Sequence, residues 1–93
     1  MIRVKARIKL YINGRKTPFM TGYRPLFTFV GEVKTSGQIT LKGRSDFPPG
    51  DEDIVEIAFL HREFLGENFG LGSRFTFGEG REPFGEGVVK ELL

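Results

Sequence analysis

Hydrophobic and polar residues alternate strictly along residues 3–12. One face carries Val4, Ala6, Ile8, Leu10 and Ile12, and the other carries Arg3, Lys5, Arg7, Lys9 and Tyr11. A period of two residues predicts a β-strand with one face buried. Asn13-Gly14 follows directly and predicts a turn, because both residue types tolerate positive φ.

Shorter runs of the same kind follow along the rest of the chain. We expect further strands at 27–33 (with Gly31 as a bulge), 38–42, 55–59, 75–77 and 84–92. Ser36-Gly37 is interpreted as a turn, and the two prolines and the glycine within residues 47–51 predict a loop. Six strands joined by Gly- and Pro-containing loops are typical of a small antiparallel barrel or sandwich. Gly85 and Gly87, inside the last expected strand, predict tight bends at barrel corners.

The 93 residues are enough for one domain, residues 1–93, with a thin margin of stability. The chain has no Cys, so disulfides and thiolate metal sites cannot reinforce it. Ten Phe and no Trp predict a core of aromatic rings that need no polar partner. No apolar run resembles a signal peptide or a membrane span, so we expect a cytoplasmic protein with no membrane contact.

The net charge of +2 hides an uneven distribution. Residues 1–45 carry ten Lys/Arg and one acid, which gives +9, and residues 46–93 carry four Lys/Arg and eleven acids, which gives −7. One interpretation is a surface that faces a polyanion. The other is that basic strands pair with acidic strands inside one sheet, and this second interpretation is the more ordinary one.

Residues that carry enzyme chemistry are scarce. The phosphate-binding pattern GxxxxGK[ST] is absent, so no bound nucleotide is expected. His61, the single His, excludes a multi-His zinc site, and the acids at 51–53 lack the spacing of a calcium loop and predict a solvated turn. We therefore expect no enzyme activity, no cofactor and no metal.

The order of motifs resembles the C-terminal β-barrel (domain 3) of elongation factor Tu. The segment GRKTPFMTGYRPLFTF, residues 14–29, is similar to the family pattern GRHTPFFxGYRPQFYF. SGQITL at 36–41, PPGDEDIVEIAFLH at 48–61 and SRFTFGEGREPFGEGVVKELL at 73–93 resemble later family segments in the same order. The resemblance implies an all-β fold, a six-stranded antiparallel closed β-barrel, without the family's GTPase domain.

In that family the barrel contacts aminoacyl-tRNA as well as protein domains, which implies RNA-binding candidates here. Carried over position by position, the candidates are Arg15, Lys16, Arg24, Ser36, His61, Glu79 and Gly80, together with the basic face of the first strand. Three departures weaken a tRNA interpretation: Leu26 replaces a Gln, Gly78 replaces an Arg, and Glu82 stands where Arg is usual.

Residues 62–73 carry extra residues relative to the family, among them Phe64, Leu65 and Phe69. These three are candidates for a protein-interaction patch, or they fold back over a barrel end. The sequence thus predicts a non-enzymatic binding module for a protein partner or a structured, tRNA-like RNA in a translation-related role. The alternatives are a self-associating or structural interaction domain without RNA binding, and a remnant without a partner.

Overall fold

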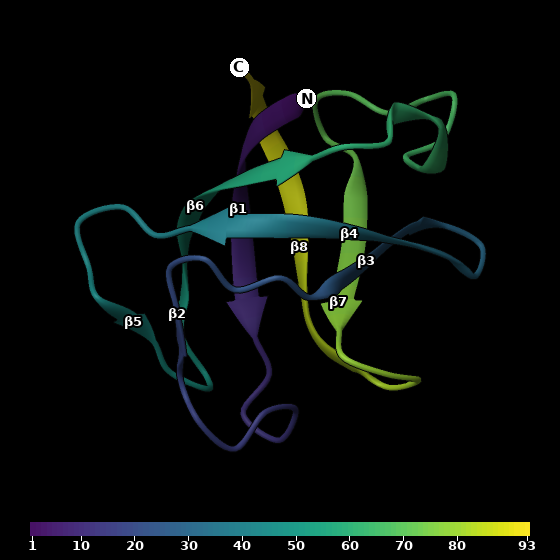
Figure 1. Ribbon diagram of the computed structural model, residues 1–93. Coiled ribbons are helices and arrows are strands. Elements are labelled where there is room, and N and C mark those ends of the chain that lie inside the picture. The colour runs from purple at the N-terminus through teal and green to yellow at the C-terminus, as the bar shows by residue number, and fades with distance from the viewer.

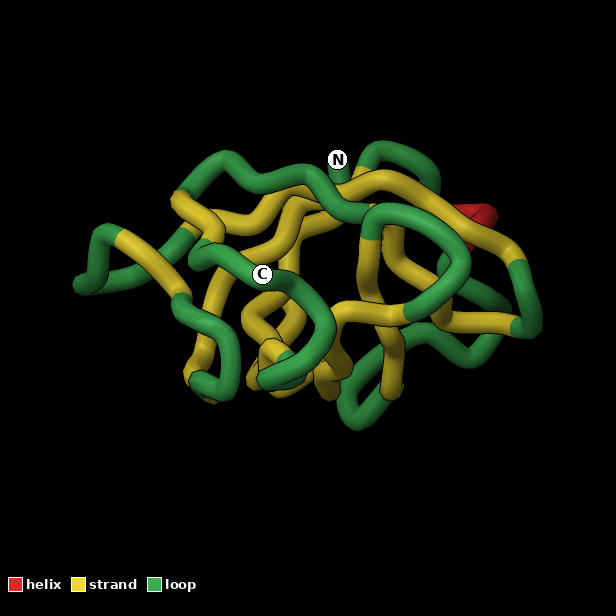
Figure 2. The backbone as a smooth tube through the Cα atoms, turned by 90° about the horizontal axis from the view of Figure 1, so that it is seen from below, coloured by secondary structure: helices red, strands yellow, loops and turns green.

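The computed structural model describes residues 1–93 and confirms the closed six-stranded antiparallel barrel (Figure 1). The strands are β1 (Ile2–Leu10), β3 (Leu26–Val30), β4 (Val33–Thr40), β6 (Glu52–Phe59), β7 (Arg74–Gly78) and β8 (Pro83–Leu92), in the order β1-β6-β4-β3-β7-β8 around the barrel. Figure 2 shows the flattened cross-section from below, and the principal extents are 33 × 29 × 19 Å. The one helical segment, η1 (Arg62–Phe64), has three residues, and no helix is long and apolar enough to cross a membrane.

A second, two-stranded sheet lies beside the barrel. It pairs β2 (Phe19–Met20) with β5 (Asp46–Phe47), and Phe19 lies opposite Phe47. Phe47 was expected in a loop, but it is fully buried and extended, and the loop begins only at Pro48. We call this two-stranded sheet the annex.

The alternation at the N-terminus correctly predicts the buried face of β1. Val4, Ala6, Ile8 and Leu10 are each at most 1% exposed. Ile12 is an error of the prediction: it is 74% exposed, because β1 ends at Leu10 and the chain turns. The Gly14 N–H donates to the Tyr11 carbonyl at 3.2 Å and closes that turn.

The turn between β3 and β4 is not where the sequence placed it. Gly31, with φ of 53°, lies in the turn, so it is not a bulge inside one strand. The predicted turn at Ser36-Gly37 is wrong, because both residues lie inside β4, with Gly37 opposite Phe59. A Cβ on Gly37 would come within 2.9 Å of the Phe27 and Phe59 rings, so glycine is present to make room for them.

The glycines of β8 also make room for rings, which replaces our expectation of bends at barrel corners. Gly85 lies opposite Phe77, and Gly87 lies opposite Phe75. A Cβ on either glycine would come within 2.5 Å of the facing ring. The rings on β7 therefore fill the space that is free because Gly85 and Gly87 have no side chains.

Strand pairing accounts for the uneven charge along the chain. β1 lies between β6 and β8, both of which come from the acidic half. Two ion pairs join β1 to β6: Arg3 Nη2 lies 2.6 Å from Glu56 Oε1, and Arg7 Nε lies 2.9 Å from Glu52 Oε2. This arrangement supports the interpretation that basic and acidic strands neutralise each other in one sheet.

Candidate functional site

Arg15 and Glu79, two of the RNA-binding candidates, lie together and bind each other. Arg15 follows β1 and Glu79 follows β7, and their side chains form an ion pair. Arg15 Nε also donates to the Thr17 carbonyl at 3.1 Å, and its guanidinium lies 4.9 Å from the centre of the Tyr23 ring. The Tyr23 hydroxyl donates to Glu79 Oε2 at 2.6 Å. Burial of Tyr23, together with this bond, raises the pKa of its hydroxyl.

These contacts continue inward as a column of stacked side chains. The Tyr23 and Phe19 ring centres are 4.6 Å apart, and those of Phe19 and Phe47 are 5.1 Å apart. The Arg44 guanidinium lies 4.7 Å from the centre of the Phe47 ring and closes the column at its far end. We call this column the five-layer stack: Arg15, Tyr23, Phe19, Phe47 and Arg44.

Carboxylates hold both ends of the five-layer stack. Glu79 binds Arg15, while Asp51 and Asp53 bind Arg44, the latter at 3.1 Å. The bond from Arg44 lowers the pKa of the Asp51 carboxyl. The pKa of Asp53 is also lowered, first by the backbone N–H of Ile54 and then by Arg44. Two of the acids that were expected in a solvated turn, Asp51 and Asp53, thus bind a partly exposed cation, Arg44.

Cation pairing separates the basic residues into two groups. Arg3, Arg7, Arg15, Lys42 and Arg44 have carboxylate partners within 4.0 Å. Lys16 is exposed and has no carboxylate partner, and Arg24 Nη2 donates to Gln38 Oε1 at 3.0 Å. Arg24 and Ser36 line one small hollow of about 50 Å³ on the side of the barrel.

The remaining RNA-binding candidates are dispersed. Gly80 is exposed beside Glu79 in the loop after β7, at the lower end of the barrel in Figure 1. His61 follows β6 at the opposite end, where its Nδ1 lies 3.3 Å from Glu63 Oε1. The seven candidates therefore occupy both ends and one side of the barrel and do not form one site.

The segment at 62–73 folds back over the end of the barrel. Leu65 is 2% exposed and belongs to the core, so it is not available to a partner. The Phe69 ring packs on Phe29 with centres 5.3 Å apart, and the Arg62 guanidinium lies over the Phe69 ring, 5.3 Å from its centre. Phe64 alone among the three interaction candidates presents a large part of its side chain to solvent, as the residue is 41% exposed.

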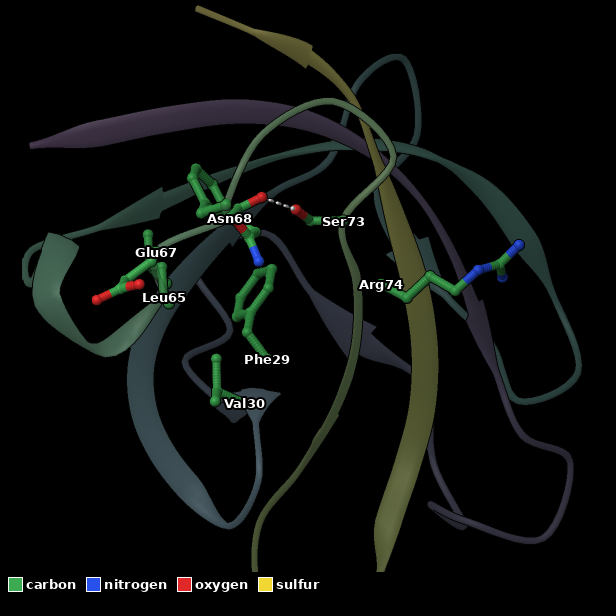
Figure 3. A pocket seen from close by; sticks show the side chains of 9 residues that line it. Phe29, Val30, Leu65, Glu67, Asn68, Ser73 and Arg74 are labelled. Atoms are coloured by element: carbon green, nitrogen blue, oxygen red, sulfur yellow. Dashed lines mark hydrogen bonds between the residues drawn. The ribbon is translucent and has the colours of Figure 1, made fainter.

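A hollow of about 440 Å³ lies between this segment and the barrel wall (Figure 3). Its apolar lining comes from Phe29, Val30, Leu65 and Phe69. Figure 3 shows the Asn68 amide pointing toward Phe29, whereas the side chains of Glu67 and Arg74 point away. The hollow exists because the pairing of β3 with β7 ends at Thr28 and Thr76, so the two strands separate beyond these residues. We call it the end hollow.

Exposed apolar side chains occur within five residues, along the chain, of the residues that line the end hollow, but only Val30 among them is itself a lining residue. They are Val30 at 47%, Val33 at 44%, Leu60 at 59%, Phe64 at 41% and Leu71 at 70% exposed. Sequence reasoning missed Val30 and the lining role of Phe29, because alternation marks Phe29 only as a strand core residue. No protein-family model matches the chain.

Proposed function

We propose that this chain is a non-enzymatic protein-binding module with a barrel of the elongation factor Tu C-terminal type. The end hollow carries the proposal, because its apolar lining includes exposed Val30, and exposed Phe64 precedes the lining residue Leu65 in the chain. Apolar hollows with exposed hydrophobic neighbours are typical of protein-interaction sites. The occupant that suits this lining is an apolar side chain of a partner protein.

The distribution of charge favours a protein partner over a polyanion. Five of the fourteen Lys/Arg side chains are held by carboxylates, including Arg15, an RNA-binding candidate that matches the family residue. Backbone phosphates supply most of the affinity for a nucleic acid, so cations that already have internal partners weaken that interpretation.

Variant-dependent binding tests the protein-binding proposal. We expect Val30→Asp and Phe64→Glu to abolish capture of a partner by the immobilised protein, and calorimetry with the captured protein to show the same loss. Met20→Glu is the matched control, because Met20 is 62% exposed but lies in the annex. Equal capture by all three variants would contradict the proposal. Dimers that form with rising concentration, measured by sedimentation velocity, would assign the end hollow to self-association instead.

A structured RNA is the second candidate partner, favoured by Lys16, Arg24 and Ser36. Lys16 is exposed without a carboxylate partner, and Arg24 lies beside Ser36 at one hollow. The resemblance to a tRNA-contacting barrel supports a translation-related role for such binding. Titration with tRNA should then show affinity that falls steeply with salt and falls further in Lys16→Ala/Arg24→Ala. Flat titrations at low salt would remove this candidate.

A further inference from the structure

We infer that Asn13 is a site of spontaneous covalent modification, at which the side-chain amide is lost and the main chain is rerouted through an isoaspartyl bond. Asn13 occupies the third position of the turn from Tyr11 to Gly14 and is exposed to solvent. Its side-chain amide has no hydrogen-bond partner in the protein, so it is free to rotate toward the main chain.

The reaction needs the backbone nitrogen of the next residue to reach the Asn13 Cγ. Gly14 has no Cβ to obstruct that approach. Its nitrogen loses a proton to a base and attacks Cγ, which forms a new C–N bond, and the side-chain nitrogen takes up a proton and leaves as ammonia. Water then opens the five-membered ring at either carbonyl carbon and leaves an aspartyl or an isoaspartyl residue. The balance is one water consumed and one ammonia released.

Packing preserves the glycine that makes this reaction fast. A Cβ on Gly14 would lie 2.7 Å from the Phe84 carbonyl oxygen and 2.8 Å from the Phe84 Cα, both backbone atoms of β8. The φ of Gly14 is not positive, so close approach rather than backbone conformation requires glycine here. The fold therefore retains the reactive neighbour of Asn13.

One hydrogen bond restrains the reaction in the folded protein. The Gly14 N–H donates to the Tyr11 carbonyl at 3.2 Å, which is at the long end of the normal range, so local opening of this turn is sufficient. The Tyr11 N–H bond to the Phe84 carbonyl at 2.8 Å and the Arg15–Glu79 ion pair hold the chain on either side. Conversion to isoaspartate would add one main-chain methylene and one carboxylate between these two anchors.

The chain contains its own matched control. Asn68 is exposed and also occupies the third position of a turn, because the Phe69 N–H donates to the Gly66 carbonyl at 3.4 Å. The next residue is Phe69 in place of a glycine. The two asparagines share exposure and turn position and differ in the residue that follows them, while Asn68 also lines the end hollow.

Aging the folded protein at mildly alkaline pH tests the inference. We expect peptide mapping by mass spectrometry to show ammonia loss at Asn13 alone, and a carboxyl methyltransferase specific for isoaspartate to label the aged protein. The Asn13→Gln variant should not be labelled. Three results would overturn the inference: conversion at Asn13 in urea-unfolded protein but not in folded protein, equal conversion at Asn68, or an aspartyl product with no isoaspartyl product.

Discussion

Gly37 lies in β4 between two aromatic rings of the core. Because a Cβ there would come within 2.9 Å of Phe27 and Phe59, Gly37→Ala should overfill the core and lower the free energy of unfolding by about 1–3 kcal/mol. Urea unfolding measures this change. The neighbouring exposed residue provides the control, since Ser36→Ala should change stability by less than about 0.5 kcal/mol. An unchanged midpoint for Gly37→Ala would show that the rings move aside without cost.

Thr35 also lies in β4, with its hydroxyl in the core. The residue is 4% exposed, and its Oγ1 has no hydrogen-bond partner. Thr35→Val keeps the shape and removes a polar group that has lost its contact with water, so we expect a gain of about 1 kcal/mol in the free energy of unfolding. Thermal unfolding would show a higher midpoint. A lower midpoint would mean that the hydroxyl has a partner in solution.

Ionisation of Tyr11 should lower the stability of the folded protein at alkaline pH. Burial, followed by its 2.7 Å hydrogen bond to Glu86, raises the pKa of the Tyr11 hydroxyl from 10.0 to about 12. The folded state thus holds the phenol proton more tightly, so this stabilisation is complete below pH 10 and lost as the pH rises toward 12. Tyr11→Phe should lose less stability over that interval in urea unfolding. Equal slopes for the two proteins would contradict this assignment.

At the scale of elements, the annex is held by the five-layer stack, which includes its Phe19 and Phe47, as well as by the pairing of its two strands. A two-stranded sheet is marginal in water, so contacts with Arg44 must help to hold it. Arg44→Gln removes the cation over Phe47 and the bonds to Asp51 and Asp53. We expect a loss of about 1 kcal/mol and faster hydrogen exchange at Phe19 and Phe47, with β1 unchanged. Arg81→Gln is the control, because Arg81 has no carboxylate partner.

The stability of the annex should also depend on acidic pH. The pKa values of Asp51 and Asp53 are lowered in the folded state, so their contribution is present above the ordinary carboxyl range and is lost as the pH falls through it. Protection of the annex amides from hydrogen exchange, relative to their intrinsic exchange rate at the same pH, should fall below a pH of about 4, the ordinary Asp pKa. In Arg44→Gln this loss of protection should be smaller, and an identical acid response would contradict the role of Arg44.

Alternation predicts the strands that have one buried face, but it fails where a glycine inside a strand stands in a sequence with the composition of a turn. β1, β6, β7 and β8 lie close to their expected ranges. β4 was divided because Ser36-Gly37 has the composition of a turn, and the rings that require Gly37 come from other strands. The annex was missed because two-residue strands have no period. The end hollow was missed for a similar reason, since it depends on where β3 separates from β7.

At the scale of the whole molecule, the basic and acidic halves of the chain are interleaved. Strand β1 pairs with β6 and β8, which both lie in residues 46–93. Fragment 1–45 lacks these two strands, so it should not fold alone. The two fragments carry +9 and −7, and we expect an equimolar mixture to recover the β-sheet signal in circular dichroism. Association should slow as salt is added, since opposite charges steer the encounter. A folded fragment 1–45, or association that is indifferent to salt, would contradict this prediction.

In the Phe75–Gly87 and Phe77–Gly85 pairs, a ring on β7 faces a glycine on β8. Each ring occupies the space that a side chain at the facing glycine would need. The two positions of each pair are therefore coupled, because a change at one position alters what the other position can accommodate. A larger residue on β8 is tolerated only after the facing ring has become smaller, so the order in which substitutions occur matters. Descendants of this barrel would therefore change these positions in pairs or keep them both.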